Sequence, residues 1–163
     1  MLAAETPGVD VKVVSNVIDV PGTEVGFADR SDIVFIGGYQ HPPNVDAVTW
    51  FVSEVWPSVR ERIPGARFLI AGSSAPEEVR ALGREDGVEF LGFVESAEDF
   101  FAGARISVAP LRYGAGVKGK INQSMSLGVP VVTTSVGSEG MGLAHERDVL
   151  VADEASDFAD QIV

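Results

Sequence analysis

The chain has 163 residues, about the size of one ordinary domain, and 45% of them are hydrophobic, with 18 glycines and 9 prolines. This composition fits a turn-rich globular protein and excludes a disordered or fibrous one. The formal net charge of -12 argues against nucleic acid as a partner, because nucleic acid attracts clustered lysines and arginines.

Three further absences indicate the cellular setting that we expect. The chain has no cysteine, which excludes disulfides and thiolate metal sites and favours a reducing compartment. No apolar run approaches the roughly 18 to 20 residues that span a bilayer, and residues 1–14 lack the basic flank and apolar stretch of a signal peptide. We therefore expect a cytoplasmic protein without a transmembrane segment.

Short apolar runs and amphipathic segments alternate from residue 33 onward. The first run, 33–38 (IVFIGG), is continuous and ends in glycines, which is typical of a strand buried on both faces. Valines at helical spacing follow in 42–62, with Asn44 as the expected N-cap. The pattern then predicts strands at 66–72, 88–93, 105–110, 129–135 and 148–153, and helices at 75–85, 96–104, 119–128 and 154–163.

This alternation predicts the α/β class, with a Rossmann-like, open and mostly parallel sheet that carries helices on both faces. Ligands of such sheets bind outside the carboxyl ends of the strands, near a switch in strand order. Residues 1–30 differ, because 11–20 resembles one strand and a turn and the rest resembles a loop. We therefore expect a leading segment over 1–30 and one α/β domain over 31–163.

The basic residues are unevenly distributed. Between Asp99 and Glu139 there is no carboxylate, yet this span contains a third of the basic residues: Arg105, Arg112, Lys118 and Lys120. In an acidic protein such a span is where an anion would bind. The alternative is that buried strands and helix starts simply exclude acids there, which explains the two lysines beside glycines less well.

Residues 113–128, YGAGVKGKINQSMSLG, contain two familiar glycine patterns. The P-loop pattern fails, because Ile121 occupies the position of the Ser or Thr that holds magnesium. The dinucleotide pattern G-x-G-x-x-G begins at Gly114, but residues 111–113 separate it from the preceding strand, and the next strand does not end in an acid. A dinucleotide-binding domain therefore remains the weaker alternative.

The same glycines also suit a sugar-nucleotide site. Glycines before a helix let backbone N–H groups approach an anion, and the helix N-terminus and Lys118 or Lys120 add positive charge. In the helix that follows, Ile121 and Met125 face the core, whereas Lys120 and Gln123 share another face. A diphosphate near Lys120 would therefore have Gln123 within reach of the adjoining ribose.

The order of these segments resembles the C-terminal, donor-binding domain of the group 1 glycosyltransferases of the GT-B fold. A strand ending in PLR is followed by GAGVKGK, a helix, GVPVVTT and GSEGM. The resemblance covers 33–163, and residues 13–20 are similar to the hinge that joins the two domains of that fold. It implies one half of a GT-B fold, truncated at its C-terminus.

The resemblance also implies a function. This function is the transfer of a sugar, with retention of its anomeric configuration, from a UDP- or GDP-linked donor. No cofactor and no metal are expected. The donor would lie between two Rossmann-like domains, of which the N-terminal acceptor domain is missing here. We therefore expect the chain alone to be inactive, and peripheral membrane association would depend on the missing domain.

Several residues receive roles from the same resemblance. Gly37 and Gly38, in the glycine loop after the first strand, would lie against the donor phosphates. Phe93 and Val94, after the third strand, would hold the base, partly through backbone contacts. Three cations are candidates for pairing the diphosphate around the same pocket as Gly37 and Gly38: Arg112, Lys118 and Lys120. Of these, Arg112 and Lys118 would act in catalysis by stabilising the charge of the leaving diphosphate, with Gly116 close to the donor.

Other loop residues keep two interpretations each. His41 is either a phosphate or sugar contact or an exposed loop histidine. Glu139 is either a ribose or sugar contact in a glycine turn or an acid at a helix start. Ser73 and Ser74 could bind a ligand, but a helix cap is favoured.

Gln123 is the main departure from the family pattern. Members usually carry two glutamates separated by seven intervening residues, and the second accepts hydrogen bonds from the ribose; here these positions hold Ala115 and Gln123. An amide offers one acceptor oxygen where a carboxylate offers two, a loss on the order of 1 to 2 kcal/mol. A degenerate, non-catalytic GT-B module is therefore the second candidate function.

Overall fold

Six parallel strands form one open sheet in the computed structural model, which describes residues 17–163. The strands are β1 (Asp32–Ile36), β2 (Phe68–Ala71), β3 (Val88–Gly92), β4 (Ala104–Ala109), β5 (Val131–Thr133) and β6 (Leu150–Val151). Their order across the sheet is β3-β2-β1-β4-β5-β6, the order of doubly wound Rossmann folds. Each strand overlaps one of the predicted apolar runs and every pairing is parallel, so the predicted fold class is confirmed.

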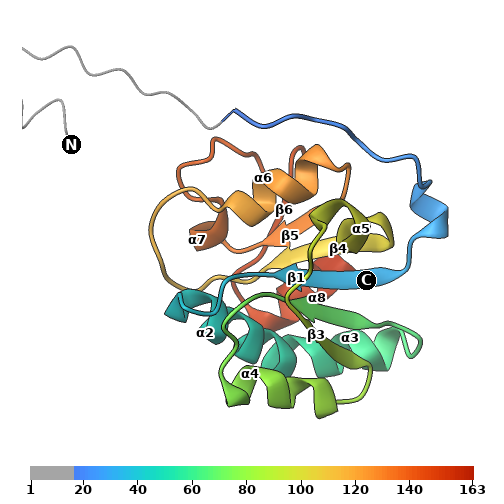
Figure 1. The fold of residues 1–163 in the computed structure, drawn as a ribbon, viewed down its shortest axis with the longest axis vertical. Helices are drawn as coiled ribbons and strands as arrows, with labels where there is room; N and C mark the ends of the chain where they lie inside the picture. Colours follow the sequence, from blue (N-terminus) through green and yellow to red (C-terminus); the bar gives the residue numbers. More distant parts are fainter. Residues whose placement is uncertain (1–16) are drawn as a thin grey trace, which may run out of the picture.

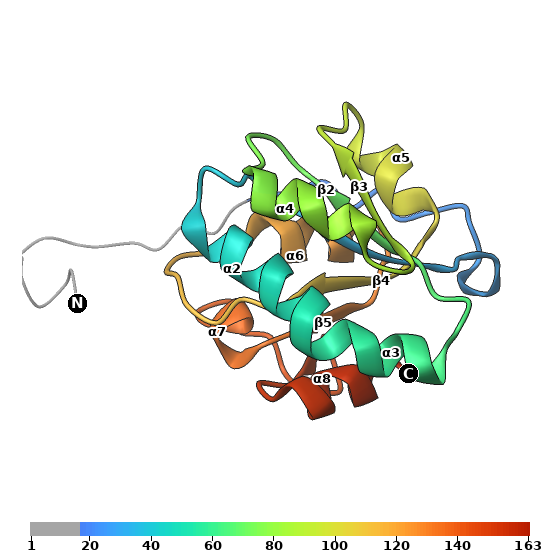
Figure 2. The same ribbon diagram turned by 90° about the horizontal axis from the view of Figure 1, so that it is seen from below.

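Helices cover both faces of the sheet (Figure 1). One face carries α5 (Ala97–Ala102) and α6 (Gly119–Ser126), and the other carries α2 (Pro42–Trp50), α3 (Trp56–Arg62), α4 (Glu77–Ala81) and α8 (Ala155–Ile162). Figure 2, seen from below, shows the second set lying across the front of the sheet. A single helical turn, α7 (Ser135–Ser138), follows β5.

The alternation of side chains along β1 divides the core into layers. Ile33 and Phe35 pack into the larger layer under α2, α3 and α8, whereas Val34 belongs to the layer on the opposite face. The larger layer is rich in phenylalanine, and the rings of Phe51 and Phe68 lie 4.5 Å apart between centroids. Each fully buried phenylalanine contributes roughly 1.5 to 3 kcal/mol to the free energy of unfolding. This layer therefore stabilises the sheet from which the loops extend.

The helix predicted over 42–62 is divided into three consecutive segments. A π-helical stretch, Phe51–Val55, separates α2 from α3. Pro57 has no N–H to donate one turn back, and a widened turn before it accommodates this missing bond. The helix also begins before the predicted cap: His41 is the N-cap and Pro42 the first helical residue, a position that suits proline because that N–H would be unpaired anyway. The prediction of Asn44 as N-cap is therefore wrong.

The strand predicted over 129–135 is shorter than expected. It ends at Thr133 because Thr134 caps the following helical turn, its side-chain oxygen accepting a hydrogen bond from the Gly137 N–H at 3.0 Å. No helix was predicted at this turn, α7.

The leading segment is described only from residue 17. Of the strand and turn predicted over 11–20, residues 11–16 lie outside the described part of the chain, and 17–20 form neither helix nor strand. Buried Arg30 anchors the end of the segment, since its Nη1 donates to the Gly128 carbonyl at 2.8 Å and its Nη2 to the Val25 carbonyl at 2.8 Å. This part of the chain is thereby fixed against the end of α6.

Candidate functional site

A pocket of about 320 Å³ lies at the carboxyl ends of β1, β2 and β3, beside the start of α6. Since β1 and β4 are neighbours and α6 follows β4, the pocket spans the point where the strand order reverses, which is where ligands of such sheets bind. Six of the predicted site residues line it: Gly37, Gly38, Phe93, Val94, Lys120 and Gln123. Four further residues complete the lining: Ile36, Asn44, Gly72 and Ser73. We call it the switch-point pocket.

Glycines let two backbone segments, the loops after β1 and β2, meet at the floor of this pocket. A Cβ atom on Gly72 would lie 1.8 Å from the carbonyl oxygen of Gly37, so only glycine fits there. A Cβ atom on Gly37 would lie 3.0 Å from the Asn44 side chain and 3.2 Å from Nζ of Lys120. The loop after β1 therefore lies directly against two polar side chains, with no side chain of its own between them.

Lys120 supplies positive charge to the pocket. Its Nζ donates to Oδ1 of Asn44 at 2.6 Å and lies 4.1 Å from the ring centroid of Phe35. Burial, and secondly the charge of Lys118, lower the pKa of Lys120 to about 7. Within residues 17–163, no carboxylate forms an ion pair with this ammonium. A half-buried, desolvated ammonium with only neutral hydrogen-bonding partners favours an incoming anion, because the anion would compensate its desolvation.

Lys118 is the N-cap of α6, two residues before Lys120. Its side chain is buried, and its Nζ donates to the Gly116 carbonyl at 2.6 Å. Gly116 itself is exposed and has a φ of 82°. Neither residue lines the switch-point pocket, although the charge of Lys118 acts on Lys120.

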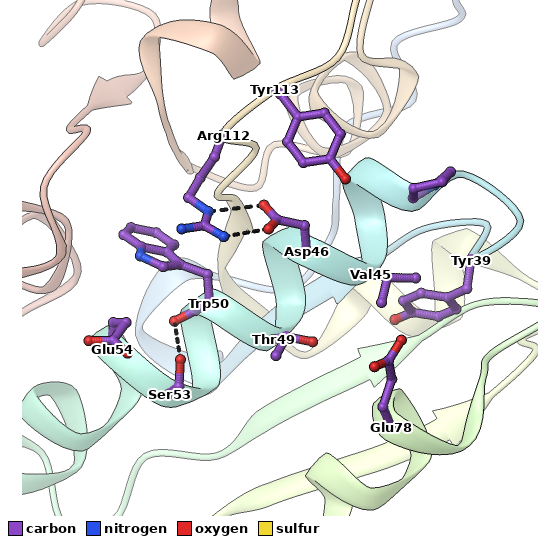
Figure 3. Close-up of a pocket in the computed structure, with 11 residues that line it drawn as sticks. Tyr39, Val45, Asp46, Thr49, Trp50, Ser53, Glu54, Glu78, Arg112 and Tyr113 are labelled. Atoms are coloured by element: carbon purple, nitrogen blue, oxygen red, sulfur yellow. Dashed lines mark hydrogen bonds and ion pairs between the residues drawn. The ribbon is translucent and has the colours of Figure 1, made fainter.

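Arg112 lies apart from the switch-point pocket, so the expectation that all three cations surround Gly37 and Gly38 is not met. Its guanidinium forms two hydrogen bonds with the carboxylate of Asp46 on α2, including Nε to Oδ2 at 2.9 Å, and its Cζ lies 5.8 Å from the Trp50 ring centroid. Figure 3 shows this pair in a second pocket, of about 560 Å³, on the outer side of α2. The bidentate pair raises the pKa of Arg112 and satisfies its charge.

The remaining candidates, His41 and Glu139, are exposed and do not line the switch-point pocket. His41 caps α2 without a side-chain hydrogen bond, which fits its interpretation as an exposed loop histidine. Glu139 follows α7 directly and so does not begin a helix.

For two pocket residues, Asn44 and Ser73, the sequence analysis favoured a capping role over a place in the site. Asn44 was assigned to the cap, although a polar residue in the first turn of a helix that leaves a carboxyl-end loop can face the ligand edge. Ser73 was assigned to capping α4, but the N-cap of α4 is Pro76. Ser73 instead lines the pocket directly after β2.

The two glycine patterns after β4 are not in the context that their chemistry needs. The G-x-G-x-x-G run follows β4, whereas the dinucleotide fingerprint occupies the first turn of the fold, after β1. Ile121 is fully buried in the core, which is consistent with the failure of the P-loop pattern. Within the described residues, no group of three or more histidine, aspartate or glutamate side chains could hold a metal ion, and no helix is long and apolar enough to cross a membrane.

Comparisons with known proteins agree with this architecture. The family model described as glycosyl transferases group 1 matches residues 30–163. An uncharacterized 44.6 kDa protein in the cps region of Klebsiella pneumoniae is 30% identical over 141 residues, which are 81% of this chain and 36% of that protein.

Solved structures match more distantly in sequence. A mutant of TarM from S. aureus, solved with Fondaparinux, alpha-GlcNAc-glycerol and UDP, gives a TM-score of 0.78 at 16% identity over 99% of this chain and 33% of TarM. The C-terminal domain of LpcC, a glycosyl transferase group 1 family protein from Francisella tularensis, gives 0.62 at 12% identity over 90% of this chain and 86% of that domain. The chain thus spans about a third of the length of the Klebsiella protein and of TarM. It belongs to the group 1 glycosyltransferase family and has the Rossmann-like α/β fold of GT-B glycosyltransferase domains.

Proposed function

We propose that the switch-point pocket binds the diphosphate of a nucleoside-diphosphate sugar, and that the chain is the C-terminal, donor-binding domain of a retaining glycosyltransferase. The observation that carries this proposal is the ammonium of Lys120, which lies at the glycine loop with only neutral hydrogen-bonding partners. A diphosphate there would gain charge-assisted hydrogen bonds and the positive end of α6.

The other walls of the pocket suit the remaining parts of such a donor. Phe93 has 72% of its surface exposed at the pocket and offers a planar apolar face to a base. Gln123 lies three residues after Lys120 on α6, so that a ribose attached to the diphosphate would come within reach of its amide. The presence of UDP in the TarM structure supports a uridine nucleotide as the first ligand to test.

The acceptor would bind to a separate domain. The chain spans only about a third of TarM and of the Klebsiella protein, and one side of a cleft buries only part of a donor. We therefore expect the chain alone to bind the nucleotide weakly and to transfer no sugar. The lack of cysteine favours a reducing, cytoplasmic setting for the reaction.

Calorimetric titration of the chain with UDP and GDP tests the proposal. Lys120→Met should weaken binding of the preferred nucleotide about 10- to 150-fold, because a hydrogen bond to a charged group contributes roughly 1.5 to 3 kcal/mol. Arg84→Gln removes an exposed cation that faces Glu77 at 3.6 Å, and should leave binding unchanged. Absence of binding at millimolar nucleotide, or equal affinity in Lys120→Met, contradicts the proposal.

One observation favours a second candidate, a GT-B module that has lost catalysis. Gln123 stands in the pocket where the family usually has glutamate. Such a module would bind neither UDP nor GDP, and Lys120→Met would leave both titrations unchanged. The same titrations therefore separate the two candidates.

A further inference from the structure

Asn44 connects the two elements that form the floor of the switch-point pocket. Its Nδ2 donates to the Gly38 carbonyl at 2.7 Å, and its Oδ1 accepts from Nζ of Lys120 at 2.6 Å. The first bond fixes the orientation of the amide, because only its nitrogen can donate to a carbonyl. The oxygen must then face the ammonium.

The surroundings of Lys120 make the neutrality of this partner important. From β1 it meets the ring of Phe35, from α2 it meets Asn44, and from the start of its own helix the charged group that acts on it is Lys118. The other residues that line the pocket carry no charge. An amide accepts the hydrogen bond of the ammonium but, unlike a carboxylate, leaves its charge uncompensated.

We propose that Asn44 is a positioning residue that holds the Lys120 ammonium toward the pocket without neutralising it, so that the bound anion completes the ion pair and a proton is taken up with it. This inference rests on the proposed function of the pocket and adds its regulation by pH. The two fail separately, because the protonation of Lys120 can be measured with no ligand present.

The direction of the pH effect follows from the pocket. Burial and then Lys118 lower the pKa of Lys120 from 10.5 to about 7, so in the free chain this lysine loses its proton as the pH rises through 7. An anion in the pocket favours the charged form and raises the pKa again. Anion affinity should therefore fall by up to about tenfold for each pH unit above 7, with uptake of close to one proton at pH 8.

Calorimetry with UDP and with inorganic pyrophosphate between pH 7.0 and 8.5 measures this effect. Titrations in two buffers of different ionisation enthalpy give the number of protons taken up. Asn44→Asp should weaken binding at pH 7 several-fold and remove the pH dependence, because its carboxylate pairs with Lys120 in advance. Thr49→Asp adds the same charge to an exposed position on α2 and should keep the wild-type pH profile. If Asn44→Asp keeps both affinity and slope, the inference is wrong.

A second measurement does not depend on Asn44→Asp, and its first step needs no ligand. The chain's lysines are Lys12, Lys118 and Lys120, so a spectrum of the chain labelled with ¹³C at lysine Cε contains few signals, which Lys→Arg variants assign. The signal of Lys120 should titrate near pH 7 in the free chain and shift its midpoint upward when pyrophosphate is added. A midpoint above pH 9.5 in the free chain overturns the inference, even if UDP binds. A midpoint near 7 that rises with pyrophosphate, although neither UDP nor GDP binds, supports the inference and refutes the proposed function instead.

Discussion

Substitution of Gly72 by alanine tests the close packing beneath the switch-point pocket. Gly72 has a φ of +147°, and its added Cβ would lie 1.8 Å from the Gly37 carbonyl oxygen and 2.8 Å from the ring of Tyr39. To reach even a 3.0 Å contact, the loops after β1 and β2 must separate by about 1.2 Å. The N–H of Gly37 bonds to the Ala71 carbonyl at 3.1 Å, so this separation also strains the end of the sheet.

Two contributions set the expected loss of stability. Placing a residue with a side chain in a backbone conformation of positive φ costs roughly 1 to 3 kcal/mol. Forcing a methyl group into close-packed surroundings costs roughly another 1 to 3 kcal/mol. We therefore expect Gly72→Ala to lower the free energy of unfolding by about 2 to 6 kcal/mol, a large share of the roughly 5 to 15 kcal/mol typical of a domain.

Urea unfolding with two matched variants separates these contributions. Gly140 has a φ of +74° and nothing within 4 Å of an added Cβ, so Gly140→Ala should show the backbone cost alone. Gly65 also has open space and lacks a positive φ, so Gly65→Ala should be neutral or slightly stabilising. Gly72→Ala should also lose nucleotide binding, since Gly37 and Gly72 line the pocket together. If Gly72→Ala is no less stable than Gly140→Ala, the packing between the two loops is not as tight as described.

Three further predictions address the site and the support beneath it. Gln123→Glu should strengthen UDP binding about 5- to 10-fold relative to pyrophosphate, because a carboxylate accepts more strongly from ribose hydroxyls; equal changes for both ligands in calorimetry would argue against a ribose contact. Arg112→Ala should leave UDP affinity within about twofold, because its guanidinium is paired with Asp46 outside the pocket; a tenfold loss would return Arg112 to the donor site. The hydroxyls of Ser107 and Ser124 are buried and lie 2.8 Å apart, and that of Ser124 also donates to a backbone carbonyl at 2.8 Å. Ser124→Ala should therefore lower the free energy of unfolding by about 1 to 3 kcal/mol in urea and Ser107→Ala by less, because only the former leaves a buried hydroxyl without a partner; equal losses would contradict this order.

The fold was predictable because strands and helices of a layered α/β sheet differ in how their apolar residues are spaced along the sequence. Continuous apolar runs such as 33–38 are typical of strands in a parallel sheet that helices cover on both faces. Local details escaped where a single residue changes the hydrogen bonding. Pro57 divides the helix over 42–62 with a π-helical stretch, and Thr134 ends β5 by capping α7. Such effects depend on backbone hydrogen bonding, which the spacing of apolar residues along the chain does not reveal.

The candidate site was predictable as far as it follows from strand ends. Gly37, Phe93 and Lys120 gather because parallel strands bring their carboxyl-end loops to one edge of the sheet. Arg112 was misplaced for a different reason. Its partner Asp46 lies 66 residues away in the sequence, and no local pattern shows which of 24 acidic residues will meet a given cation. Positive charge near a pocket was therefore predictable, but its availability to a ligand was not.

Two residues in the first turns of α2 determine whether positive charge is available to a ligand. Residues 44 and 46 are two positions apart on this helix, and each meets one of the basic residues that follow β4. The amide of Asn44 holds Lys120 and leaves its charge free, whereas the carboxylate of Asp46 holds Arg112 and satisfies it. In a chain with a net charge of -12, carboxylates are abundant, so this half-buried cation is left without a carboxylate partner only because the residue that contacts it is neutral. The neutrality of residue 44, more than the number of basic residues nearby, therefore makes this edge of the sheet attractive to an anion.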